Sequence, residues 1–161
     1  MRVLAVCLLT TLLSGCSVRR FAINKIGDAL ASGGSTFESD DDVDLVGGAL
    51  PFGLKMYEGL LSESPRHKGL LLAACQGFPA YSRVYVHYEA DVAAEKDLEV
   101  AGRLRYRARR LYLRAHRYGL RALDLAYPDI SKRLVADPKA ALSAVTKKQD
   151  VALLYWNAAA L

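Results

Sequence analysis

The sequence has few cysteines and few histidines, and their arrangement argues against several kinds of site. The cysteines are Cys7, Cys16 and Cys75. No Cys-X-X-Cys motif occurs, and the three histidines share no spacing typical of metal ligands. Phosphate-binding loops and a Ser-His-Asp order are also missing. We therefore expect a protein that is not an enzyme and that holds neither a metal nor a cofactor.

The sequence also lacks an apolar run long enough to span a bilayer. The run Val3–Leu13 has about eleven residues, whereas a transmembrane helix needs roughly 20. Arg2 precedes this run, and the small residues Ser14 and Gly15 follow it. A basic start, an apolar run and small residues form the pattern of a removed export signal. We assign residues 1–15 to a signal peptide and residues 16–161 to the mature domain.

The end of this signal, Leu13-Ser14-Gly15-Cys16, resembles the lipobox of bacterial lipoproteins. In that motif the cysteine receives a diacylglyceryl group and becomes the first residue after cleavage. Two or three acyl chains anchor a protein stably, because each buried CH2 contributes about 0.8 kcal/mol. Cys16 is therefore the predicted lipidation site and the membrane anchor. The alternative is an ordinary signal peptide with an incidental cysteine.

Extended-strand patterns are nearly absent from the mature chain, which is 52% hydrophobic and 24% charged as in globular proteins. Apolar residues instead recur at spacings of three and four, which predicts helices. The expected helices cover residues 19–31, 43–61, 68–94, 97–127, 129–135, 139–145 and a last segment capped by Thr146. Pro51 predicts a kink or an offset start in the second of these, and Pro79 is expected to kink the third.

These patterns predict an all-α fold of antiparallel helical hairpins joined by short turns. The apolar pattern Val151–Leu161 stops without a capping glycine or a polar tail. We expect that the chain is truncated here or that a partner covers this end. A second copy of the chain, in a homo-oligomer, is one such partner.

Arginines line one face of the predicted helix 97–127. Their spacing is 4-3-4-3-4, and the residues are Arg103, Arg107, Arg110, Arg114, Arg117 and Arg121. Like charges at this spacing repel each other, so an acidic protein surface, anionic lipid or acidic groups of the same fold are the expected partners. A face that is solvated or paired within the fold is the equal alternative. Export makes a nucleic-acid partner unexpected.

An aromatic row follows the predicted helix 68–94 at spacings 3-4-3. It consists of Phe78, Tyr81, Tyr85 and Tyr88. Four rings on one stripe can line a pocket for an apolar ligand, with the phenol hydroxyls orienting it. Packing against neighbouring helices is the other interpretation, and it is the more common role of such a row.

The following segments are informative when taken together: residues 19–24, 29–34, 37–42, 49–55, 70–75, 89–91, 108–115 and 153–156. They resemble the TatT family of lipoproteins associated with tripartite ATP-independent periplasmic (TRAP) transporters. The resemblance implies a tetratricopeptide-like array that faces the periplasm. It also implies a TRAP substrate-binding protein as partner, and a small apolar or organic-acid ligand.

Two points about this assignment stay open at the level of sequence. Ser17, where an Asp would be an inner-membrane signal in enterobacteria, favours the outer membrane of the cell envelope over the inner one. The alternative function is a structural envelope lipoprotein that organises protein assembly without a role in transport.

Overall fold

The structure is a computed structural model that describes residues 18–33, 37 and 39–161. Among these residues it contains helices and no β-strand, so the predicted all-α class is confirmed. The predicted signal peptide and Cys16 lie outside the described residues. Within the described part, no helix is both long and apolar enough to cross a membrane.

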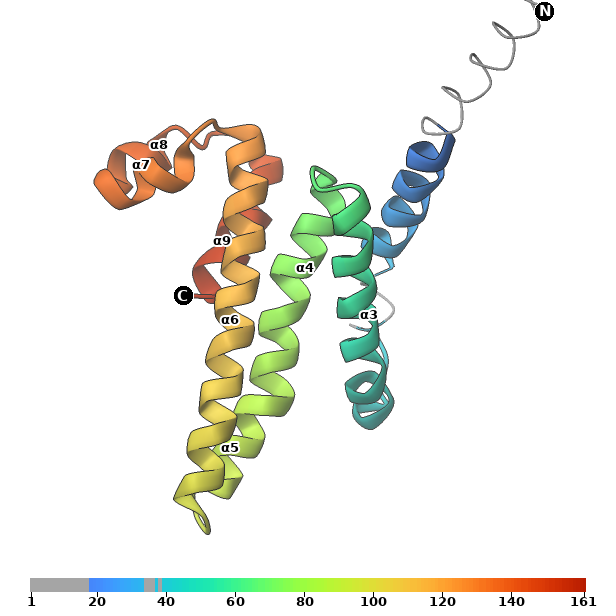
Figure 1. The fold of residues 1–161 in the computed structure, drawn as a ribbon. Coiled ribbons are helices and arrows are strands. Elements are labelled where there is room, and N and C mark those ends of the chain that lie inside the picture. The colour runs from blue at the N-terminus through green and yellow to red at the C-terminus, as the bar shows by residue number, and fades with distance from the viewer. Residues whose placement is uncertain (1–17, 34–36, 38) are drawn as a thin grey trace, which may run out of the picture.

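The helices follow one another with short connections (Figure 1). After a helix over residues 18–32, the elements are α3 (Val43–Glu63), α4 (Lys68–Tyr81), the π-helical segment η1 (Ser82–His87), α5 (Tyr88–Ala93), α6 (Leu98–Ala126), α7 (Ile130–Ala136), α8 (Pro138–Ser143), the 3-10 turn η2 (Lys148–Asp150) and α9 (Val151–Ala159). Figure 1 shows α3, α4 with α5, and α6 running in alternating directions, as helical hairpins do. A tetratricopeptide-like repeat stays a prediction.

Aspartates fix where three of the helices begin. The Asp42 carboxylate accepts a hydrogen bond from Leu45 N at 2.9 Å at the start of α3, and Asp137 does the same for α8. Asp97 accepts from two backbone amides of α6. Each cap satisfies amides that have no partner inside the helix. Thr146 was the wrong cap for the last helix, because η2 leads directly into α9 with Asp150 at its N-cap position.

The two inner prolines do not break their helices. Pro51 lies within the continuous helix α3. Pro79 lies within α4, and three residues later the helix widens into η1 instead of ending. A proline removes one i→i−4 hydrogen bond from its helix, and a π turn is one of the ways in which a helix accommodates a local disruption.

The core centres on the crossing of α4 and α6. Buried alanines recur every seven residues along α6, and they are Ala101, Ala108, Ala115 and Ala122. Such small side chains let the helices approach closely, and the Ser82 hydroxyl reaches the Ala108 carbonyl at 3.2 Å. Leu70 and Leu71 of α4 are fully buried, and each contributes about 1.5–3 kcal/mol relative to an exposed side chain.

The helix α9 is held against α6 and α4 by a buried polar contact. Asn157 donates a hydrogen bond to the His116 carbonyl at 3.0 Å, and it is only 6% exposed. Gly119 lies at the same crossing, together with the buried thiol of Cys75. Burial raises the pKa of Cys75 to about 12, against a weaker opposing effect of Asn157. Cys75 is therefore a neutral packing residue at physiological pH.

Candidate functional site

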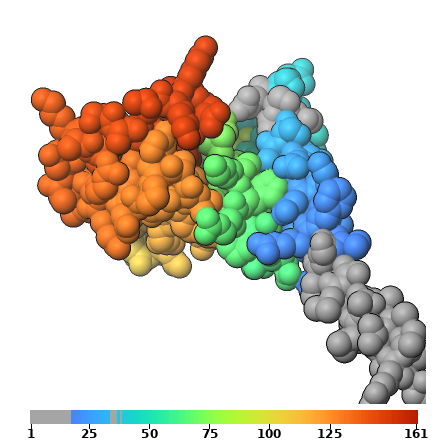
Figure 2. All heavy atoms as spheres, turned by 90° about the horizontal axis from the view of Figure 1, so that it is seen from above, coloured from blue at the N-terminus to red at the C-terminus, as the bar shows by residue number. Residues whose placement is uncertain are grey.

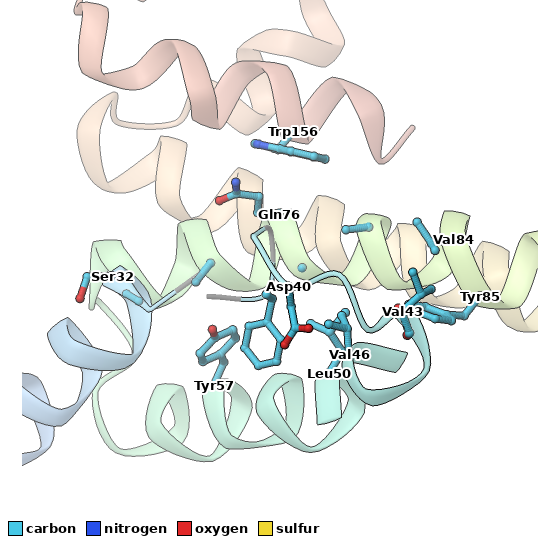
Figure 3. Close-up of a pocket in the computed structure, with 15 residues that line it drawn as sticks. Ser32, Asp40, Val43, Val46, Leu50, Tyr57, Gln76, Val84, Tyr85 and Trp156 are labelled. Atoms are coloured by element: carbon cyan, nitrogen blue, oxygen red, sulfur yellow. The ribbon is translucent and has the colours of Figure 1, made fainter. Parts of the chain in front are cut away.

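A cavity of about 460 Å³ opens between α3, α4, α9 and the helix over residues 18–32. Most of its wall is apolar: Ala31, Phe37, Val43, Val46, Leu50, Ala73, Gly77, Ala80, Val84 and Trp156. In Figure 3, Trp156 on α9 and the α3 residues Leu50 and Tyr57 lie on opposite sides, with Gln76 and Asp40 between them. This volume and this mostly apolar wall are typical of small-molecule sites.

Small residues of α4 leave room for the cavity. Ala73, Gly77 and Ala80 are spaced three to four apart, so they lie on one face of the helix. In the space-filling view (Figure 2), the green α4 lies between the blue and cyan N-terminal elements and the orange and red C-terminal half. The cavity therefore joins parts of the chain that are far apart in sequence.

His67 holds the N-terminal wall in place. Its Nδ1 accepts a hydrogen bond from Leu70 N at 3.2 Å, which makes Nε2 the protonated nitrogen of the neutral ring. Nε2 lies 3.1 Å from the Asn24 carbonyl and 3.3 Å from Asp28 Oδ1. Gly27 permits this approach, since a Cβ there would lie 2.8 Å from His67 Nε2. The helix over residues 18–32 is thus fixed where Ala31 and Ser32 line the cavity.

The polar groups on the wall are mainly hydrogen-bond acceptors. Three hydroxyls already donate to backbone carbonyls: Ser32 to Ala29, Tyr57 to Leu30 and Tyr85 to Val43. Burial raises the pKa of Tyr57. For Tyr85, burial raises the pKa first and the negative charge of Asp44 adds to it. Both phenols are therefore neutral, and what they offer a ligand is oxygen lone pairs.

The predicted aromatic row divides between the core and the cavity. Tyr85 lines the cavity, and its hydroxyl lies 2.8 Å from the Val43 carbonyl. Phe78 is buried and stacks on Tyr118 of α6, with ring centroids 6.1 Å apart. Tyr81 packs against Tyr85, whereas Tyr88 is 64% exposed. A role of the whole row in ligand binding stays a prediction, and Tyr85 is its member at the cavity.

The arginine face also divides into two lines, each with a spacing of seven. One line consists of Arg107, Arg114 and Arg121, whose guanidinium groups lie over the rings of Tyr81, Phe78 and Tyr118. Arg121 also donates to the Pro65 carbonyl at 2.8 Å. Arg114 is the member of this line that contacts both α4 and α3, through Phe78 and Glu58, whereas Arg107 and Arg121 make their contacts as exposed side chains.

The other line of arginines points away from α3 and α4. Arg103 pairs with Glu99 one turn earlier on the same helix. Arg110 lies over the ring of its neighbour Tyr106. Arg110 and Arg117 are exposed, and neither makes an ion pair with the described residues. Arg110 and Arg117 therefore make fewer contacts with the rest of the fold than the arginines of the first line do.

Glu58 of α3 is the acidic residue that Arg114 contacts. It is 15% exposed, and it accepts hydrogen bonds from Tyr118 at 2.8 Å and from Lys55 at 2.6 Å, with Arg114 at 3.5 Å. Burial raises the pKa of Glu58, but the hydrogen bonds from Lys55 and Tyr118 and the charges of Arg114 and Lys55 outweigh it. The pKa of Glu58 is lowered overall, so Glu58 is ionised at neutral pH.

Sequence patterns alone missed most of the cavity. Asp42 caps α3, and Asp40 close by in sequence lines the cavity. Trp156 belonged to a segment interpreted as lacking a partner, and Tyr57 and Gln76 carried no signal of their own. Among the described residues, no group of three or more His, Cys, Asp or Glu side chains is arranged to hold a metal ion.

These features define a class: an all-helical scaffold with an apolar cavity large enough for a small molecule. The family described as TRAP transporter T-component matches residues 39–161, and the chain belongs to this family. The chain is also similar to an uncharacterized protein of Treponema pallidum (strain Nichols), with 33% identity over 162 residues. That match covers 90% of this chain and 50% of the relative, so the chain spans about half the relative's length.

Proposed function

We propose that this protein is a lipid-anchored, periplasm-facing scaffold of a TRAP-type transporter, which binds the periplasmic substrate-binding protein and holds a small ligand. The observation that carries the proposal is the family match over residues 39–161. The family is described as a component of a transporter and not by a catalytic activity, which supports a role in binding.

The cavity supports the ligand-binding part of this function. Its wall is mostly apolar, and four aromatic residues line it: Phe37, Tyr57, Tyr85 and Trp156. Aromatic and aliphatic walls with a few polar groups favour small molecules that have an apolar body. The ligand enters from the side of the N-terminal elements and α3 in this proposal, because the acidic and exposed Asp40 marks that rim.

The outward arginines support the partner-binding part. Arg110 and Arg117 present positive charge on the solvent side of α6, without an acidic partner among the described residues. Opposite charge across an interface mainly sets specificity and the rate of association. An acidic patch on the substrate-binding protein is the surface that this line of arginines fits.

A binding measurement with the TRAP substrate-binding protein of the same genome tests this proposal. We expect binding that weakens as salt rises, because exposed charges are screened over about 8 Å at physiological ionic strength. The double variant Arg110→Glu, Arg117→Glu should bind at least about tenfold more weakly, with an unchanged melting temperature. If the unmodified protein does not bind, the structural envelope lipoprotein becomes the better explanation. Unchanged binding of the double variant would remove α6 from the interface.

The anchor gives a separate prediction. Replacing Cys16 by Ser removes the thiol that the lipid modifies, so the protein should lose incorporation of labelled fatty acid and should leave the membrane fraction. Cys75→Ser is the matched control, because Cys75 is buried and distant in sequence from the signal. Fatty-acid labelling that survives Cys16→Ser would contradict the lipoprotein assignment.

A further inference from the structure

The cavity that holds the proposed ligand carries negative charge at its rim. Asp40 is the charged residue among those that line it. The sequence between Lys25 and Lys55 contains no lysine, arginine or histidine, and its acidic residues are Asp28, Glu38, Asp40, Asp41, Asp42 and Asp44. About half of the residues that line the cavity belong to the described part of this segment: Ala31, Ser32, Phe37, Asp40, Val43, Val46 and Leu50. A ligand that enters the cavity therefore meets negative charge.

The hydrogen-bonding groups of the wall also favour a positively charged ligand that donates hydrogen bonds. The Ser32, Tyr57 and Tyr85 hydroxyls already donate their protons to backbone carbonyls. A ligand can therefore only donate to these three oxygens. A carboxylate can only accept, whereas an ammonium group can only donate. The donors of the lining side chains are neutral N–H groups of Gln76 and Trp156, so a buried carboxylate would find no opposite charge there.

The position of Asp40 fits the same ligand. One carboxylate oxygen accepts a hydrogen bond from Asp42 N at 2.9 Å, which fixes the side chain and leaves the second oxygen for other contacts. Figure 3 shows Asp40 between Tyr57 on one side and Val46 and Leu50 on the other. A cation at Asp40 would therefore place its hydrocarbon body against the apolar wall. Aromatic ring faces also attract cations, by about 0.5–2 kcal/mol.

We propose that this cavity selects small apolar cations, molecules with a hydrocarbon body and a protonated amine, over carboxylates of the same length. The proposal rests on the ligand-binding part of the proposed function and narrows it. The amine pairs with Asp40, while the body contacts Val46, Leu50 and Trp156. The organic-acid class of ligand is then excluded from this cavity.

Three probes of equal length test the selectivity: n-octylamine, which is protonated at pH 7.5, octanoate, and uncharged 1-octanol. Trp156 is the single tryptophan of the chain and lines the cavity, so its fluorescence reports binding of each probe directly. We expect the dissociation constant of octylammonium to be at least about tenfold lower than that of octanoate. Asp40→Asn should reduce this ratio to about threefold or less, while Asp41→Asn, at an exposed neighbour outside the lining, should leave it unchanged.

The outcomes separate this inference from the proposed function. Octanoate that binds as tightly as octylammonium, while octanol also binds, would overturn the selectivity and leave the ligand-binding cavity standing. An equal effect of Asp40→Asn and Asp41→Asn would overturn the assignment of the amine to Asp40. Failure of all three probes to change the Trp156 emission would overturn the ligand-binding role itself, and with it the selectivity.

Discussion

Replacing Gly119 by Ala should destabilise the protein by about 2–4 kcal/mol, although alanine is the better helix former. A Cβ at this position would lie 2.0 Å from Asn157 Nδ2 and 2.8 Å from Cys75 Sγ. Asn157 is 6% exposed and Cys75 is fully buried, so neither can move into solvent. The change disrupts the hydrogen bond from Asn157 to the His116 carbonyl and overpacks the contact of α6 with α9. Urea unfolding followed by circular dichroism measures it.

Gly102→Ala is the matched control on the same helix. Nothing lies within 4 Å of a Cβ at Gly102, so only the backbone effect remains. This variant should be more stable by about 0.5–1 kcal/mol, because glycine loses more backbone entropy on helix formation than alanine. Adding Asn157→Ala to the Gly119 variant removes the atom that clashes and should recover part of its loss. Equal and stabilising effects of both glycine changes would show that α9 does not pack as described.

Reversing Arg114 to Glu should lower the stability by about 2–3 kcal/mol, which corresponds to a fall in melting temperature of several degrees. Arg114 lies 3.5 Å from the mostly buried Glu58 carboxylate and over the ring of Phe78. The change replaces an attraction with a repulsion between two carboxylates and removes the contact with the ring. Thermal unfolding at neutral pH, where Glu58 is ionised, is the appropriate measurement.

Arg110→Glu provides the control for this change, because it alters the same charge one turn away on an exposed side chain. Surface substitutions of this kind usually change stability by less than about 0.5 kcal/mol. A melting temperature that falls equally for both variants would mean that the two lines of the arginine face are not distinct. A melting temperature that falls for Arg114→Glu alone would show that Arg114 stabilises the fold and that Arg110 does not.

Much of the local structure could be predicted because it depends on neighbours in sequence. Apolar residues at spacings of three and four predicted the helix over residues 97–127, and α6 spans Leu98–Ala126 with its alanines Ala101, Ala108, Ala115 and Ala122 buried. The helix expected over residues 139–145 begins one residue earlier, at Pro138, where Asp137 is the N-cap. These signals succeed because helix periodicity and capping involve residues within about one or two turns of each other.

The prediction that Thr146 caps the last helix was wrong because of the residues that directly follow it. Thr146 is a residue type that caps helices, but the following residues Lys148–Asp150 form a 3-10 turn before α9 begins. Pro79 likewise marks an irregularity, whose form the sequence does not specify. Pro79 is buried, and three residues later the Ser82 hydroxyl donates to the Ala108 carbonyl of α6, where the helix continues as a π turn.

The sequence by itself determined that the chain is helical, where most helices begin and end, and that one helix has a basic face and another an aromatic row. Only the tertiary structure decided which side of each stripe faces inward. Arg114 and Arg110 are equivalent by spacing, yet Arg114 meets Glu58 and Arg110 meets solvent. The cavity likewise joins Ser32, Tyr57, Tyr85 and Trp156 across four helical segments. The physical reason is that periodicity defines the faces of one helix, whereas the contacts between faces depend on how separate helices cross.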